Sequence, residues 1–170
     1  MSAIRAMAVI ALVAFFLGVI VVGDAPAGEK GRVVSRETYF ASSIPSVKVP
    51  DVDGHALYLY DAKGISFNEK WGVAVIASGG MLDYIKGTGS NQGYSHFTFE
   101  DGSTITASWK GESKGETAPG TAGRREASGN WTYIKGTGRF EGIQGGGTWK
   151  SHILGSGLWY SDTVGEYALP

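Results

Sequence analysis

Polar side chains alternate with two phenylalanines along residues 93–100, the stretch of this sequence best suited to acid–base chemistry. In an extended strand, residues two apart point to the same side of the sheet. The polar residues that share one face in this way are Tyr94, His96, Thr98 and Glu100. Facing a protein interior, such a line would orient or protonate a bound ligand. The opposite orientation is favoured, because Phe97 and Phe99 then fill the interior and the polar line meets solvent.

Glu141, which precedes a glycine-rich stretch, is a further candidate for a ligand contact in the interior. The 3 histidines, His55, His96 and His152, lack the spacing of metal ligands, and isolated histidines of this kind are more often surface or hydrogen-bonded core residues. The chain also lacks cysteine, which removes thiol nucleophiles and thiolate metal ligands. We therefore expect no metal site and no bound cofactor, and the sequence identifies no catalytic residue.

The chain of 170 residues carries 15 basic and 16 acidic side chains, which leave a net charge of -1. Such a balance lacks the basic surface that attracts nucleic acids, so no nucleic-acid partner is expected. The length fits one domain. Because there is no cysteine, packing rather than disulfides must stabilise that domain.

Residues 1–27 have the layout of a secretory signal. Arg5 precedes an apolar run over residues 6–22, and Ala25-Pro26-Ala27 supplies small residues for cleavage. The run is slightly short for a bilayer span, which needs about 20 residues, so cleavage near Ala27 is favoured over an uncleaved membrane anchor. Both interpretations predict an exported protein, secreted or periplasmic, with membrane contact only through a retained N-terminal segment.

Glycine, with 27 residues, and frequent aromatic residues indicate an all-β fold with tight turns. Residues 28–53 contain two prolines and are expected to form an extended lead-in with at most a short strand around residues 33–40. The β domain is expected over residues 54–170, with a flexible loop at 111–129 where no large apolar side chain occurs. No segment after residue 27 shows a convincing helical period.

Alternating or continuous runs of β-forming residues mark the expected strands. They are 55–60, 71–77, 81–86, 93–100, 103–110, 130–135, 140–150, 152–161 and 164–169. This amounts to about eight strands at the close spacing of an antiparallel sandwich or closed barrel. The 5 tryptophans are expected in the core and at the barrel rim, some of them lining a pocket.

The segment Tyr-Ile-Lys-Gly-Thr-Gly occurs twice, at residues 84–89 and 133–138. Phosphate-binding loops place such glycines between a strand and a helix, but neither copy precedes a helical pattern. We therefore interpret each copy as a strand that ends in a glycine-bracketed turn. Residues 142–149 contain four further glycines, which in a strand indicate a bulge, a barrel corner or close approach of another backbone.

The last part of the chain resembles the allene oxide cyclase-type barrel proteins, a grouping that includes plant dirigent proteins. The resemblance lies in Tyr-Ile-Lys-Gly-Thr-Gly-Arg-Phe at residues 133–140, the glycine-rich strand after it and the closing residues 165–170. The resemblance implies a single closed antiparallel barrel of about eight strands with an apolar lumen, often oligomeric. Family members with known activity steer the cyclisation or coupling of a reactive hydrophobic intermediate. No segment matches their catalytic positions residue by residue, so none is transferred.

Our leading hypothesis is an exported binding module that holds a small hydrophobic ligand in the barrel lumen. The lumen candidates are Tyr94, His96, Glu100 and Glu141. One alternative is a cyclase- or dirigent-like enzyme, against which an interior without ionisable or hydrogen-bonding side chains would count heavily. The other is a structural or interaction protein of the cell surface, and the resemblance adds a homo-oligomer as the expected assembly.

Overall fold

The computed structural model describes residues 28–115, 125–155 and 157–170. The predicted signal or anchor at 1–27 and the central part of the predicted loop, 116–124, lie outside the described residues. The elements are β1 (Lys30–Ser43), β2 (Ser46–Lys48), β3 (His55–Asn68), β4 (Gly72–Ile85), β5 (Thr88–Phe99), β6 (Thr104–Gly115), β7 (Arg125–Thr137), the 3₁₀ turn η1 (Gly138–Phe140), β8 (Gln144–Gly155) and β9 (Leu158–Ala168).

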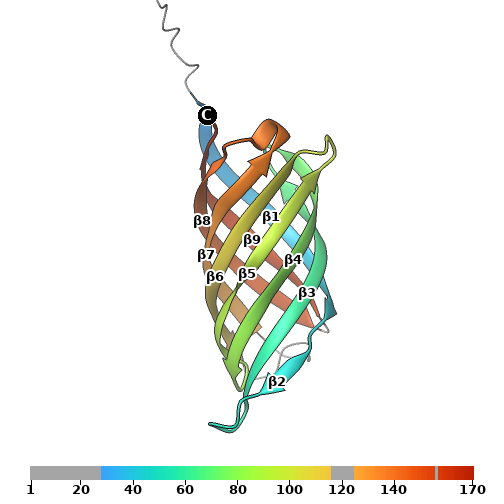
Figure 1. The fold of residues 1–170 in the computed structure, drawn as a ribbon, viewed down its shortest axis with the longest axis vertical. Coiled ribbons are helices and arrows are strands. Elements are labelled where there is room, and N and C mark those ends of the chain that lie inside the picture. The colour runs from blue at the N-terminus through green and yellow to red at the C-terminus, as the bar shows by residue number, and fades with distance from the viewer. Residues whose placement is uncertain (1–27, 116–124, 156) are drawn as a thin grey trace, which may run out of the picture.

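The strands form one closed antiparallel barrel in which most neighbours in sequence are also neighbours in space (Figure 1). The sheet runs β1-β9-β8-β7-β6-β5-β4-β3-β2, and pairing between β1 and β3 closes it. The short β2 pairs only with β3, so the barrel has eight strands and β2 is an addition at its edge. The prediction of an all-β fold with a closed eight-stranded barrel is therefore confirmed. Within the described part of the chain no helix is long and apolar enough to cross a membrane.

The barrel begins earlier in the chain than residue 54. β1 occupies most of the segment predicted as a lead-in. It pairs with β9 over residues 30–40 and with β3 over residues 35–43. From Val33 to Phe40 its residues alternate between buried and more exposed positions, with the period of two of a β-strand. Pro45 and Pro50 lie after the end of β1 and do not interrupt it. β6 and β7 likewise extend into the predicted loop, to Gly115 and from Arg125.

Residues 71–77 and 81–86, predicted as two strands, belong to the single strand β4. Gly79 and Gly80 do not bend the chain between them. A Cβ atom on Gly80 would lie 2.6 Å from the Trp109 ring, so glycine is needed there to admit a neighbouring indole. The same arrangement occurs where a Cβ atom on Gly111 would lie 2.6 Å from the Trp149 ring. Several of the glycines thus make room for tryptophan inside the barrel.

The two Tyr-Ile-Lys-Gly-Thr-Gly copies end their strands in different ways. In the first copy, Lys86 and Gly87 both have positive φ, 52° and 85°, and form the tight turn between β4 and β5. In the second copy the strand continues to Thr137, and Gly138, with φ of 60°, starts η1. The same six residues therefore give a hairpin in one place and a strand followed by a 3₁₀ turn in the other.

A cluster of buried apolar side chains closes the end of the barrel where η1 and the C-terminus lie (Figure 1). Phe140 of η1 is 1% exposed, and its ring lies 4.7 Å from that of Phe99 and 5.1 Å from that of Trp71, measured between centroids. Ile143, just after η1, is also buried in this cluster. The turn after β7 thereby acts as an internal plug for this end of the barrel.

Candidate functional site

The residues selected from the sequence as lumen candidates lie on the outside of the barrel. Tyr94 is 61% exposed, and His96, Glu100 and Glu141 are exposed as well. None of the four lines the cavity described below. The hypothesis that these four side chains face the lumen is therefore wrong. The strand has the orientation that the sequence favoured, because Phe97 lines the cavity and Phe99 is buried.

The three histidines lie apart from one another: His55 and His96 make separate polar contacts, and His152 stacks on Tyr160. His96 contacts Thr106 on the neighbouring strand, with 2.9 Å between Nδ1 and Oγ1. The ring nitrogens of His55 lie 2.5 Å from Oδ1 of Asp51 and 2.7 Å from Oδ1 of Asp83. The hydrogen bond to Asp83, and to a smaller extent that to Asp51, raises the pKa of His55. In the described ranges no group of three or more His, Cys, Asp or Glu side chains is arranged to hold a metal ion.

A cavity of about 180 Å³ occupies the barrel lumen below the Phe140 cluster. All eight barrel strands contribute to its wall, and the lining continues to Ile44 and Gly157 in the connections at the opposite end. The wall is rich in aromatic residues and includes every tryptophan of the chain: Trp71, Trp109, Trp131, Trp149 and Trp159. The prediction that some tryptophans line a pocket is thus confirmed.

The aromatic rings of this wall contact one another in series. Tyr39 stacks on Trp159, with 5.0 Å between ring centroids and 13° between planes, and Trp159 meets Tyr60 edge to face at 5.8 Å. Across the lumen, Tyr133 contacts Trp131 at 4.7 Å. Because packed rings have few rotamers open to them, they hold the shape of the cavity.

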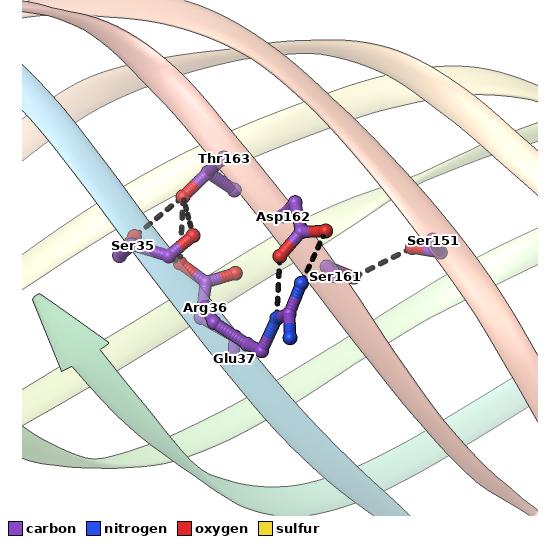
Figure 2. A network of polar contacts seen from close by, with 7 residues as sticks. All are labelled: Ser35, Arg36, Glu37, Ser151, Ser161, Asp162 and Thr163. Carbon is purple, nitrogen blue, oxygen red and sulfur yellow. Dashed lines mark hydrogen bonds and ion pairs between the residues drawn. The ribbon is translucent and has the colours of Figure 1, made fainter.

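Glu37 places a carboxyl group among these rings. Its side chain points inward from β1, the residue is 6% exposed, and it lines the cavity. Ser35 Oγ and Thr163 Oγ1 lie 3.1 and 3.2 Å from Oε1, and the Tyr39 hydroxyl lies 3.1 Å from Oε2. Figure 2 shows the two aliphatic hydroxyls, from β1 and β9, meeting at the carboxyl group.

Burial raises the pKa of Glu37 from 4.5 to about 7, since a carboxylate loses its hydration in this environment. Hydrogen bonds from Ser35, Tyr39 and Thr163 favour the ionised form but offset only part of this effect. Burial also raises the pKa of Tyr39, so its phenol stays neutral and donates to the carboxylate. Glu37 can therefore hold or release a proton near neutral pH.

The adjacent cation does not neutralise this carboxyl group. Arg36 follows the alternation of the strand to the outer face, where its Nε and Nη2 donate to the two carboxylate oxygens of Asp162 at 2.7 and 2.9 Å (Figure 2). Among the described lining residues, no lysine, arginine or histidine accompanies Glu37. The lumen of the described structure thus contains a single carboxyl group and no basic side chain.

Most of the other polar lining groups are paired with each other. Ser78 and Ser95 lie 3.0 Å apart, and Ser151 and Ser161 lie 2.6 Å apart, between their hydroxyl oxygens. Asn91 donates to Ser113 at 3.1 Å, while its Oδ1 is buried and has no hydrogen-bond partner. Glu37 is the one carboxyl group among the described lining residues, which makes it the principal polar group of the site.

Sequence reasoning missed Glu37 because it lies in the segment interpreted as a lead-in. The signal that could have found it is the alternation of Val33, Ser35, Glu37 and Tyr39, which puts one acidic residue on the inward face of a strand. Acidic residues on a buried face are rare unless they are paired or functional.

No protein-family model matches this chain, and no curated protein matches it at a significant level. The resemblance to allene oxide cyclase-type proteins therefore remains a prediction.

Proposed function

We propose that the protein binds a small hydrophobic ligand in its barrel lumen, with a polar group of the ligand held by Glu37. The observation that supports this proposal is the combination of an aromatic cavity with one buried carboxyl group at its wall. Ligand sites are typically apolar hollows with a few polar groups that fix orientation. A cavity of about 150 Å³ lined by apolar side chains accommodates benzene, so about 180 Å³ suits a ligand of one or two rings.

Calorimetric titration of the purified protein with naphthylmethanol, a two-ring alcohol, tests the proposal. Tryptophan fluorescence gives a second readout because all the tryptophans line the cavity. We expect saturable binding that is lost in Ala127→Phe, where a new ring would fill the lumen. The matched control is Thr132→Phe on the same strand, whose side chain is exposed and outside the lining. Absence of binding to the wild type, or equal binding to both variants, would refute the proposal.

A second candidate function is catalysis of the cyclase or dirigent type, and Glu37 specifically favours it. A carboxyl group with a pKa of about 7 in an aromatic cavity can act as a general base when ionised and as a general acid when protonated. The hydroxyls of Ser35, Tyr39 and Thr163 hold it in one orientation. This is the kind of buried ionisable group that an inert lumen would lack.

The basicity of Glu37 can be tested without knowing the substrate. The ring opening of 5-nitrobenzisoxazole needs only a base: a carboxylate removes the ring C–H proton while the N–O bond breaks to release a coloured phenolate. We expect a protein-dependent rate that rises with pH around about 7 and disappears in Glu37→Gln. A rate that survives this substitution would place the base elsewhere and remove the support for catalysis by Glu37.

We also propose that the protein is exported and that it forms a homo-oligomer, and each of these claims has its own test. Mass spectrometry of the N-terminus from the native cell distinguishes a signal cleaved near Ala27 from a retained anchor, and a retained anchor would favour the cell-surface role. Light scattering of the purified protein tests whether it forms the homo-oligomer that the family resemblance implies.

A further inference from the structure

The charge of the lumen differs from that of the whole protein. The chain is nearly neutral, with a net charge of -1, but the described lining contains one carboxyl group and no ammonium, guanidinium or imidazole group. The other titratable lining groups are phenols, on β1, β3, β4 and β7: Tyr39, Tyr60, Tyr84 and Tyr133. When Glu37 is ionised, the cavity therefore holds an uncompensated negative charge.

The hydrogen bonds around Glu37 do not use its full capacity. Ser35 and Thr163 lie 2.5 Å apart between their hydroxyl oxygens, and each hydroxyl has a single hydrogen to donate. One of the two hydrogens is used between them, so the pair supplies the carboxylate with one donor at a time. Tyr39 supplies a second donor. A carboxylate accepts about four hydrogen bonds, which leaves lone pairs for donors on a ligand.

The walls beside Glu37 are suited to a cation. Tyr39 donates to the carboxylate and stacks on Trp159. Burial raises the pKa of Tyr133, and the nearby charge of Glu37 raises it further. Faces of tyrosine and tryptophan rings attract cations, and the attraction grows when water is excluded. A buried carboxylate without a counter-charge also becomes less costly when a cation pairs with it.

We infer that the lumen selects hydrophobic ligands that carry a protonated amine, with Glu37 as the counter-charge and the surrounding rings as the walls of the ammonium site. This inference rests on the proposed binding function and specifies its ligand class. A ligand with a carboxylate would meet the like charge of Glu37 and is disfavoured. A neutral alcohol of the same shape gains the apolar contacts but lacks the charge pairing.

Binding of an ammonium group beside Glu37 affects the proton that this carboxyl group holds. Because Glu37 is partly protonated at pH 7, an ammonium group that binds beside it must displace that proton. Amine binding at pH 7 is therefore expected to release about half a proton per ligand, and alcohol binding none. Asp162 on the outer face of β9 also acts on Glu37 through the wall and raises its pKa, and Arg36 pairs with Asp162 there.

Three probes with one ring system test the inference: naphthylmethylamine, naphthylmethanol and naphthoate, titrated by calorimetry at pH 8. We expect the amine to bind at least about tenfold more tightly than the alcohol, and the alcohol more tightly than naphthoate. Repeating the amine titration at pH 7 in two buffers with different ionisation enthalpies measures the released protons.

Glu37→Gln keeps the shape of the side chain but removes its charge. We expect the amine to lose its tenfold advantage and its proton release in this variant, while the alcohol binds as in the wild type, which also shows that the lumen is intact. Glu100→Gln, which removes an exposed carboxyl group from the outer face, is the matched control and should retain the preference. If Glu37→Gln fails to fold, the order in which the three probes bind the wild type decides.

The outcomes separate the two claims. If none of the three probes binds, the proposed binding function fails and the inference fails with it. If the alcohol or naphthoate binds the wild type as tightly as the amine, or if the amine keeps its advantage in Glu37→Gln, the cation inference is wrong while the binding function stands.

Discussion

Replacing Glu37 by glutamine should change how the stability of the barrel depends on pH. The pKa of Glu37 is about 7 in the folded protein, raised by burial, against an ordinary value of 4.5 that serves for the unfolded chain. Between these two values the folded protein binds more protons than the unfolded one, so the free energy of unfolding falls as pH rises. Below 4.5 both states are protonated and above about 7 both are ionised, so the loss is confined to that window.

The magnitude follows from the two pKa values. A difference of one in pKa corresponds to about 1.4 kcal/mol, so the change from 4.5 to about 7 amounts to about 3 kcal/mol. Glutamine does not titrate, so wild type and variant differ by this amount between the ends of the window. The contributions of all other titrating groups are common to both proteins and cancel.

Urea unfolding at pH 4.5, 6 and 8, followed by tryptophan fluorescence, measures this difference. We expect the wild type to lose about 3 kcal/mol relative to Glu37→Gln between the first and last pH. Glu100→Gln removes a carboxyl group from the outer face and shows whether loss of any acidic side chain has the same effect. A stability difference that is constant across the window, or that grows in the opposite direction, would refute the reasoning about Glu37.

Three further predictions concern the hydroxyl donors, the barrel plug and the glycines. Tyr39→Phe removes the hydroxyl that donates to Oε2 of Glu37, so we expect the pKa of Glu37 to rise above about 7, as measured by the pH profile of unfolding. Phe140→Ala empties a position that is 1% exposed and should cost about 4 kcal/mol in urea unfolding; a loss below about 1 kcal/mol would contradict its role as the plug. Gly165→Ala would place Cβ 2.3 Å from the carbonyl oxygen of Gly146 and should lower the free energy of unfolding by about 2 kcal/mol. Gly79→Ala is the control and should be tolerated, because its Cβ would lie 3.4 Å from its nearest neighbour. Equal stability losses in the two variants would contradict this account of the glycines.

The sequence predicted the fold class well because its signals are local. Alternation along residues 93–100 predicts a strand from a few neighbouring residues, and β5 contains all of them except Glu100. It failed at Gly79 and Gly80, which look like a bend in the sequence. Gly80 instead admits Trp109 from a strand that pairs with β5 rather than with β4, a relation that no local pattern contains.

The candidate site was harder to predict because it depends on closure of the barrel. Glu37 is buried only because β1 joins the first and last parts of the chain, pairing with both β3 and β9. Thr163, which contacts its carboxyl group, lies 126 residues away in the sequence. The polar line of Tyr94, His96 and Glu100 was more evident in the sequence than Glu37. Its alternation with Phe97 and Phe99 is compatible with either orientation of the strand, and burial of the phenylalanines determines which orientation is adopted.

The most direct measurement is the pH titration of the Glu37 carboxyl carbon by nuclear magnetic resonance, with and without naphthylmethylamine. The proposed site predicts an apparent pKa of about 7 in the free protein and a clear decrease when the amine is bound. A Glu37 that titrates near 4.5, or whose pKa is unchanged at saturating amine, would contradict a buried carboxyl group that meets ligands in the lumen.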